Sequence, residues 1–81
     1  MNIKKQLYLN FPKKLVDQPL LFQVGHKFKI VTNIRGASVS RGVGIIAVEF
    51  SGEKSEVERA VEWLEAKGLV IEEMKETKPK V

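Results

Sequence analysis

The 81-residue chain contains no cysteine, only one histidine, and no apolar run long enough to cross a membrane. The missing cysteine excludes disulfides, thiolate nucleophiles, iron–sulfur clusters and cysteine-based zinc sites. His26 has no second histidine at metal-ligand spacing and no serine or carboxylate at triad spacing, so we expect a solvated ring and no metal site. The first residues lack the apolar core of a signal peptide, which predicts a cytoplasmic protein without membrane insertion.

What the chain does contain is the balance of an ordinary folded domain. Charged residues make up 30% of the sequence and hydrophobic residues 43%. A chain of this length has room for one thin layer of core. We therefore expect a single domain over residues 1–75, followed by a flexible charged tail over residues 76–81.

The net charge of +4 is distributed unevenly along the sequence. Residues 1–48 contain eight lysines and arginines against Asp17 alone, whereas residues 49–81 contain six against nine acids. Such polarity indicates either an anionic partner or acids that share one solvated helix, and the second interpretation is the simpler one.

Three segments alternate apolar and polar residues, as strands do when one of their faces is buried. They are residues 3–11, residues 28–34 and residues 44–50. The glycine- and serine-containing residues 36–42 predict a hairpin loop between the second and third strands. Residues 69–74 predict a last, short strand.

Two further segments have helical periodicity. Asp17, two residues before a proline, predicts a capped start for a first helix that ends near residues 25–27. Ser55 and Glu58 form a capping-box pattern at the start of a second helix. Gly68 is placed to end that helix as its C-terminal cap.

The resulting order, β-α-β-β-α-β, predicts a ferredoxin-like α+β fold. Its sheet has four antiparallel strands, with the first and third in the centre, and both helices lie on one face. The helices can bury their apolar stripes only against the sheet face that carries most of the apolar side chains. Those side chains are Leu7, Leu9, Ile30, Ile46, Val48 and Phe50.

The other face of the predicted sheet has no cover from this chain. Its side chains combine an apolar strip with polar groups: Tyr8, Val31, Ile45 and Ala47, with Asn10, Asn33 and Glu49. Apolar groups clustered on an open sheet indicate a surface for a partner. We assign Tyr8, Asn10, Val31 and Glu49 to a candidate dimer interface.

Catalysis has no support in the sequence, so we predict that the protein is not an enzyme. Glu72 and Glu73 lie at a predicted sheet edge, where we expect no burial that would raise the pKa of one carboxyl above that of the other. Acid–base catalysis by the pair would need such a difference. The glycines of residues 42–44 precede a strand, whereas a phosphate-binding loop precedes a helix. This segment therefore predicts a hairpin turn.

Four segments together resemble the NIL domain, the C-terminal regulatory unit of methionine ABC-importer ATPases. They are QPLL at 18–21, FKIVTNIRGA at 28–37, GIIAVEFSG at 44–52 and VERAVEWLEAKGLVIEEM at 57–74. The Asn-Ile-Leu signature of that domain, in its second strand, stands here as Asn33-Ile34-Arg35. The resemblance implies a ferredoxin-like domain that pairs with a second copy and, in the importers, binds methionine at the paired surface.

The resemblance carries the signature asparagine over to Asn33, whose amide offers donors and an acceptor for an amino acid's carboxylate and ammonium. Val31 beside it, with Ile45 and Ala47 across on the third strand, completes a candidate site for a thioether chain. Arg35 places a charge next to that site. The alternative is that Asn33 bonds within the hairpin or across a dimer.

We therefore predict a stand-alone NIL-type regulatory domain, without a cofactor, that forms a homodimer and senses a methionine-like amino acid. Arg35 at the third signature position supports an alternative, a ligand-free protein-interaction or assembly module. Nucleic-acid binding on the open face is a weaker alternative, motivated by Lys4, Lys29 and Arg35. Only Tyr8 supplies the aromatic that base stacking on the central strands needs.

Overall fold

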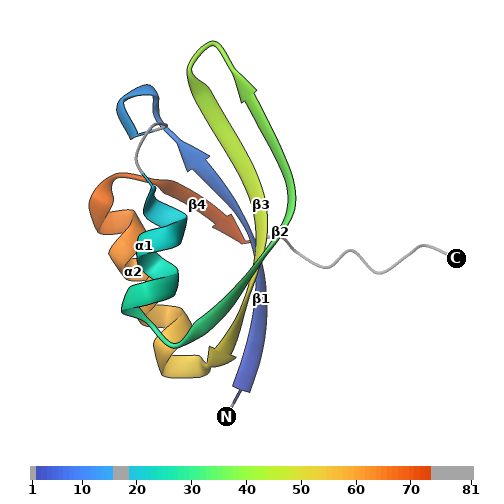
Figure 1. The fold of residues 1–81 in the computed structure, drawn as a ribbon, viewed down its shortest axis with the longest axis vertical. Coiled ribbons are helices and arrows are strands. Elements are labelled where there is room, and N and C mark those ends of the chain that lie inside the picture. The colour runs from blue at the N-terminus through green and yellow to red at the C-terminus, as the bar shows by residue number, and fades with distance from the viewer. Residues whose placement is uncertain (1, 16–18, 74–81) are drawn as a thin grey trace, which may run out of the picture.

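The strands of the computed structural model, which describes residues 2–15 and 19–73, form one antiparallel sheet. The elements in chain order are β1 (Asn2–Phe11), the 3-10 helix η1 (Lys13–Leu15), α1 (Leu20–Lys27), β2 (Ile30–Ser40), β3 (Val43–Glu53), α2 (Lys54–Lys67) and β4 (Val70–Glu73). The strand order β2-β3-β1-β4 puts β1 and β3 in the centre and β2 and β4 at the edges. Both α-helices lie on one face of the sheet (Figure 1), so the predicted ferredoxin-like fold is confirmed.

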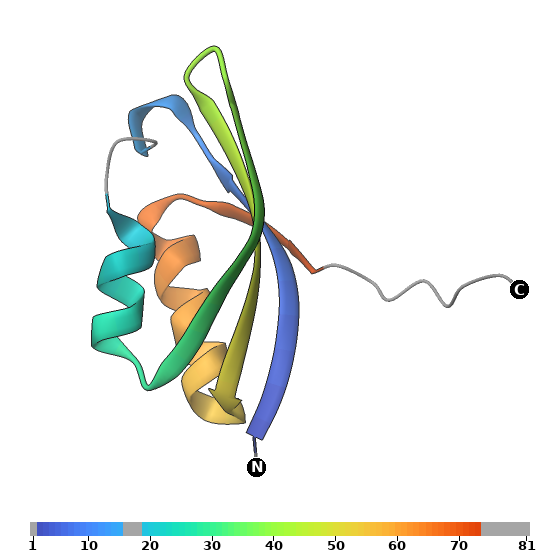
Figure 2. The same cartoon turned by 45° about the vertical axis from the view of Figure 1, so that its right-hand side comes forward.

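The domain is a slab of two layers, with the sheet on one side and the helices on the other (Figure 2). Its principal dimensions are 35 × 35 × 17 Å. Between the layers lies one cluster of apolar side chains: Leu7, Leu9, Phe11, Leu20, Val24, Phe28, Val48, Phe50, Val57, Ala60, Leu64 and Leu69. The predicted core face of the sheet is thus confirmed, with Ile30 and Ile46 half-buried at its margin.

The helices begin at points that differ from the predictions. The N-cap of α1 is Pro19, which makes no side-chain cap bond, and Asp17 lies outside the described residues. The capping box of Ser55 and Glu58 is wrong, because α2 begins one residue before that serine. β3 pairs with β1 up to its last residue and passes directly into α2, so strand pairing determines where the helix begins. Gly68 ends α2 in the left-handed conformation, as predicted.

The β2–β3 hairpin is longer than the sequence predicts. Residues 36–40, predicted as part of a loop, continue β2 in pairing with β3. Only Arg41 and Gly42 form the turn, with φ of 53° and 78°. Positive φ at both central residues is the mark of a type I′ turn, whose twist matches that of the flanking strands. Strand pairing has therefore overridden the weak strand propensity of glycine and serine.

A β-bulge interrupts β2 near its middle. Ile34 pairs with Val48 and Gly36 pairs with Ala47, so Arg35 is the extra residue. The bulge shifts the alternation of side chains along the strand. Beyond it, the odd-numbered residues 37 and 39 share the helix side of the sheet, whereas before it the odd-numbered residues lie on the opposite side.

The predicted tail, residues 76–81, lies outside the described residues, and so does Met74 at the end of the predicted last strand. Within the described ranges β4 ends at Glu73. None of the helices in this part of the chain has the length and apolar character needed to cross a lipid bilayer.

Replacing Arg41 by asparagine should stabilise the domain by about 0.5–1 kcal/mol, because an L-residue at positive φ is strained and asparagine tolerates this conformation best after glycine. Thermal unfolding should show a Tm higher by a few degrees. The β-branched variant Arg41→Val should lower the Tm instead. Equal Tm values for the two variants would contradict the turn geometry.

Candidate functional site

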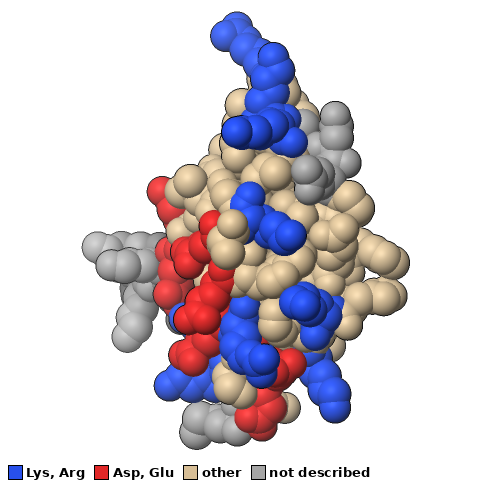
Figure 3. Space-filling model, turned by 90° about the vertical axis from the view of Figure 1, so that its left-hand side faces the viewer, with Lys and Arg blue, Asp and Glu red and all other residues tan. Residues whose placement is uncertain are grey.

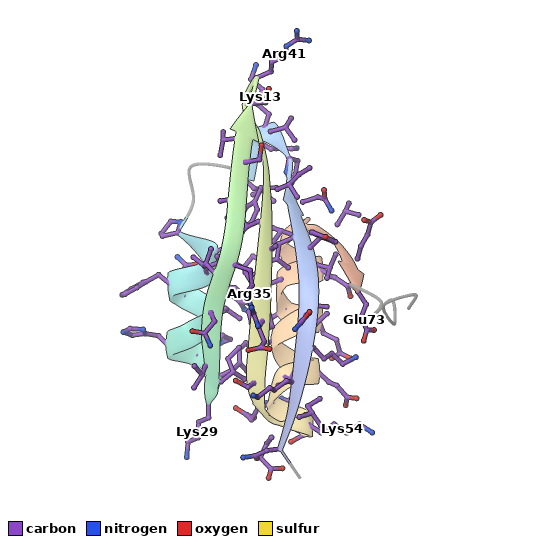
Figure 4. All side chains as sticks on the ribbon, turned by 90° about the vertical axis from the view of Figure 1, so that its right-hand side faces the viewer. Lys13, Lys29, Arg35, Arg41, Lys54 and Glu73 are labelled. Atoms are coloured by element: carbon purple, nitrogen blue, oxygen red, sulfur yellow. The ribbon has the colours of Figure 1, made fainter. Side chains whose placement is uncertain are left out.

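The sheet face turned away from the helices is covered by no described segment (Figures 1 and 4). Cross-strand partners point to the same side of a sheet, so the register identifies the side chains that share this face. The pairs across β1 and β3 are Lys4–Ser51, Gln6–Glu49, Tyr8–Ala47 and Asn10–Ile45. Those across β2 and β3 include Val31–Ser51 and Asn33–Glu49. We call this surface the open face.

The residues predicted for the ligand site and the dimer interface share one surface in the structure. All the residues predicted for ligand or partner contact lie on the open face: Tyr8, Asn10, Val31, Asn33, Arg35, Ile45, Ala47 and Glu49. What they bind stays a prediction.

Glu49 is the centre of a polar cluster on the open face. Its Oε2 accepts hydrogen bonds from Arg35 Nη2 and from Gln6 Nε2, each at 3.4 Å. The Glu49 side chain is 13% exposed and the Arg35 side chain 57% exposed. Figure 4 shows Arg35 in the middle of the face. A surface ion pair of this kind adds at most about 1 kcal/mol to stability, so its main effect is to hold two opposite charges side by side.

Asn33 lies directly across from Glu49 and two residues from Arg35. An amide, a guanidinium and a carboxylate are therefore neighbours on β2 and β3. A guanidinium binds carboxylates, a carboxylate binds ammonium groups, and an amide binds either. This arrangement has the chemistry to hold both charged ends of a free amino acid.

The prediction that Ile45 and Ala47 lie across from Asn33 is wrong, because Asn33 pairs with Glu49. Ala47 pairs with Gly36. Ile45 pairs with Ser38, four residues along β3 from the residue that faces Asn33, which is a separation of about 13 Å. The cause is the length of the hairpin, whose strands continue well beyond the bulge. The open-face apolar side chains nearest to Asn33 along the two strands are those of Val31 and Ala47.

A hollow of about 480 Å³ opens at the Val31 end of the open face. It is lined by Asn2, Ile3, Lys4, Val31, Ser51 and Gly52. Val31 is 61% exposed there, so an apolar group placed against it would leave water. The hollow therefore offers space for an aliphatic or thioether chain next to the polar cluster.

Sequence reasoning missed Val70 as a residue of the open face and missed one contact of Gln6. Val70 on β4 is exposed and pairs with Asn10, whose Nδ2 donates a hydrogen bond to the Val70 carbonyl oxygen at 3.0 Å. A four-residue strand is too short for alternation to identify its face. Gln6 was visible as an open-face residue of β1, but no sequence signal indicated its bond to Glu49.

His26 and Glu73 make separate contacts away from the polar cluster of the open face. No three histidine or acidic side chains within residues 2–15 and 19–73 gather closely enough to hold a metal ion. His26 contacts Phe22, with 4.3 Å between the ring centroids. Glu73 forms an ion pair with Lys5 at 3.6 Å on the helix side of the sheet.

Comparison with known sequences identifies relatives for most of this chain. The family model of the NIL domain matches residues 5–73. The methionine import ATP-binding protein MetN of Helicobacter pylori strain J99 is 31% identical over a match of 65 residues, and the match covers 75% of this chain and 20% of that protein. The MetN protein of Helicobacter acinonychis strain Sheeba matches with the same identity and coverage. The chain thus spans about a fifth of the length of the curated relatives it matches.

Two solved structures share the fold. The C-terminal domain of an ABC transporter/ATP-binding protein from Enterococcus faecalis superposes with a TM-score of 0.77 and 18% identity, over 86% of this chain and 82% of that chain. The de novo designed protein Foldit4 superposes with a TM-score of 0.61 and 14% identity, over 98% of this chain and 100% of that chain. At these identities the likeness shows the fold alone.

Proposed function

The chain belongs to the NIL domain family, and we propose that it is a cytoplasmic, non-catalytic regulatory domain that senses a methionine-like amino acid on a homodimer. Its similarity to a segment of methionine import ATP-binding proteins supports methionine as the first ligand to test. The observation that carries the proposal is the grouping of Asn33, Arg35 and Glu49 on an uncovered sheet face.

The three polar groups have distinct roles in the proposed site. Arg35 and Asn33 bind the ligand carboxylate, while Glu49 accepts hydrogen bonds from the ligand ammonium. The thioether chain enters the hollow beside Val31. Charge-assisted hydrogen bonds contribute about 1.5–3 kcal/mol each when water is excluded, and on an open surface water competes for the same groups.

A second copy placed on the open face would supply the missing cover. The face exposes Tyr8, Val31, Ile45 and Val70, which two copies can bury against each other. Its charges are mixed, with Lys4 and Arg35 alongside Glu49 and Glu72, so two copies can meet without net repulsion. Ligand binding and pairing are then linked: a ligand held between the copies stabilises the dimer.

Isothermal titration calorimetry with L-methionine should give saturable heat, and Asn33→Ala should weaken binding by at least tenfold. The reason is the loss of a hydrogen bond to a charged group, about 1.5–3 kcal/mol. Gln23→Ala, which removes an exposed amide on α1, is the matched control and should bind like the wild type. The absence of both heat and thermal shift at millimolar methionine would rule the sensor out.

Val31→Glu should convert the dimer into a monomer in sedimentation velocity experiments. The substitution adds a carboxylate beside Glu49 on each paired surface, while the 61% exposure of Val31 spares the folded monomer. Gln23→Glu adds the same charge on α1 and should leave the dimer intact. A monomeric wild type, or equal dimerisation of both variants, would refute pairing through the open face.

Arg35 favours a second candidate function, a ligand-free protein-interaction module. It takes the place of leucine in the Asn-Ile-Leu signature and lies 57% exposed at the centre of the face. An exposed arginine beside apolar groups is typical of protein interfaces. Loss of the dimer in Val31→Glu together with silent methionine titrations would favour this candidate over the sensor.

A further inference from the structure

β2 is the longer of the two edge strands, and its outer side has no partner strand in the described part of the chain. Residues 33–40 are all exposed. Proteins usually protect such an edge with charged residues, prolines or bulges. Here the bulge and the arginine stand at position 35, and residues 36–40, Gly-Ala-Ser-Val-Ser, carry neither a charge nor a proline. We call residues 36–40 the distal edge.

An apolar cavity of about 160 Å³ opens beside the distal edge, on the helix side of the sheet. Its lining comes from α1 and the three strands next to it, and includes Phe22, Val39 and Ile46. Phe22 and Val39 are both 65% exposed, an unusual degree for large apolar residues that line the same cavity. A cavity of about 150 Å³ with an apolar lining holds a benzene-sized group, so this one has room for one large apolar side chain.

Positive charges lie at both ends of the distal edge. Arg35 precedes it and Arg41 follows it, six residues apart, which is about 20 Å along an extended chain. Lys13 adds a third cation, because its side chain lies against Gly42 of the turn and next to Arg41 (Figure 4). The described residues of η1, α1 and β2 include no acid. On the helix side of the molecule the acids lie along one flank and at the lower end, away from the end that carries the β2–β3 turn (Figures 1 and 3).

We propose that the distal edge binds an extended segment of a partner protein as a fifth strand of the sheet. One apolar side chain of that segment fills the cavity beside Val39, and carboxylates about six residues apart meet Arg35 and Arg41. Backbone hydrogen bonds supply affinity in such strand addition, whereas the cavity and the charges select the sequence. The partner segment is therefore acidic at both ends and apolar in the middle.

The β2 strand of a second copy does not fit this edge. Antiparallel pairing of two distal edges places Arg35 of each copy opposite Arg41 of the other, and like charges directly opposite each other destabilise a sheet. The acidic β4 strand of a second copy, which contains Glu72 and Glu73, has the charge to occupy the distal edge. The experiment therefore has to distinguish this self-association from the binding of a partner protein. The cavity lies on the helix side, and only Arg35 is shared with the proposed amino-acid site on the open face, so strand addition at the distal edge does not require amino-acid sensing.

The test is a fluorescence anisotropy titration of two labelled, end-capped peptides with the full chain. The acidic probe is Glu-Thr-Val-Leu-Val-Thr-Glu, and the control probe has lysine in place of both glutamates. We expect saturable binding of the acidic probe that weakens as salt is added, and at least tenfold weaker binding of the lysine probe. Absence of saturation with the acidic probe, or equal binding of the two probes, overturns the proposal.

Variants locate the binding surface. Val39→Lys places a charge at the mouth of the cavity and should weaken binding of the acidic probe at least tenfold. Val43→Lys is the matched control, since this exposed valine belongs to the same hairpin but pairs with Ser40 on the open face, and its affinity should stay within twofold of the wild type. Arg41→Asn, which suits the turn, should weaken binding at least threefold.

Thermal unfolding first establishes that each variant is folded. Equal effects of Val39→Lys and Val43→Lys would then disprove binding at the distal edge. The protein alone is also examined by sedimentation. If it forms linear oligomers that grow with concentration, and Val39→Lys abolishes these oligomers, the occupant of the distal edge is β4 of a second copy. The assignment to a partner protein is then overturned.

Discussion

Gly52→Ala should destabilise the domain by about 2–3 kcal/mol. Gly52 has a φ of 156°, and an added Cβ would lie 2.8 Å from the Lys29 carbonyl oxygen and 3.4 Å from the Ile30 Cα. These are backbone atoms at the start of β2, where Ile30 pairs with Gly52, so they cannot move away without loosening the sheet. Thermal unfolding followed by circular dichroism should show a Tm lower by roughly 10–20 °C.

Gly36→Ala is the matched control for this prediction. It also replaces a strand glycine, but no atom lies within 4 Å of the Cβ that it adds. Its free energy of unfolding should stay within about 0.5 kcal/mol of the wild type. Similar losses in both variants would show that the close approach at Gly52 does not set the cost.

Leu64→Ala should cost about 3 kcal/mol, since a fully buried leucine loses its transfer free energy and leaves a cavity. Leu64 is one of the three buried residues through which α2 packs against the rest of the core, together with Val57 and Ala60. A domain of this size has a total stability on the order of 4–12 kcal/mol. Urea unfolding should therefore show a midpoint lower by roughly 2 M.

The neighbouring substitution Glu65→Ala supplies the control for Leu64→Ala. Glu65 is exposed on the same turn of α2, so its replacement changes the charge of the helix but not the packing of the core. Its urea midpoint should stay close to that of the wild type. A comparable shift in both variants would mean that the helix, and not the buried contact, is what the substitution perturbs.

The parts of the fold that the sequence predicts well are those where burial and local pattern agree. β1 alternates over its whole length because one of its faces packs against helices, and the apolar stripe of α2 ends at a glycine suited to the left-handed cap. The distal edge of β2 was predicted as loop because Gly36 and Ser38 favour turns. Its strand conformation comes from pairing with β3, which no local pattern shows.

The candidate site divides in the same way. Alternation before the bulge placed Val31, Asn33 and Arg35 on one face, and the ion pair between Arg35 and Glu49 confirms that placement. The distance of Ile45 from Asn33 could not be predicted, because register depends on where the turn lies and the turn was predicted too early. The cavity beside Val39 was invisible for a similar reason, since it needs α1 and the hairpin together.

The flatness of the domain makes its mode of pairing measurable in solution. One axis of the slab is 17 Å and the other two are 35 Å. The short axis runs across the strands, since Figure 1 looks down it and shows the sheet and helix layers side by side. Two copies stacked on their open faces therefore lengthen one of the 35 Å axes and form an elongated particle. Two copies joined along their sheet edges instead lengthen the 17 Å axis to roughly 39 Å and are nearly isometric. Small-angle X-ray scattering therefore distinguishes a pair built on the amino-acid site from a pair built on the strand edges by its maximum dimension alone.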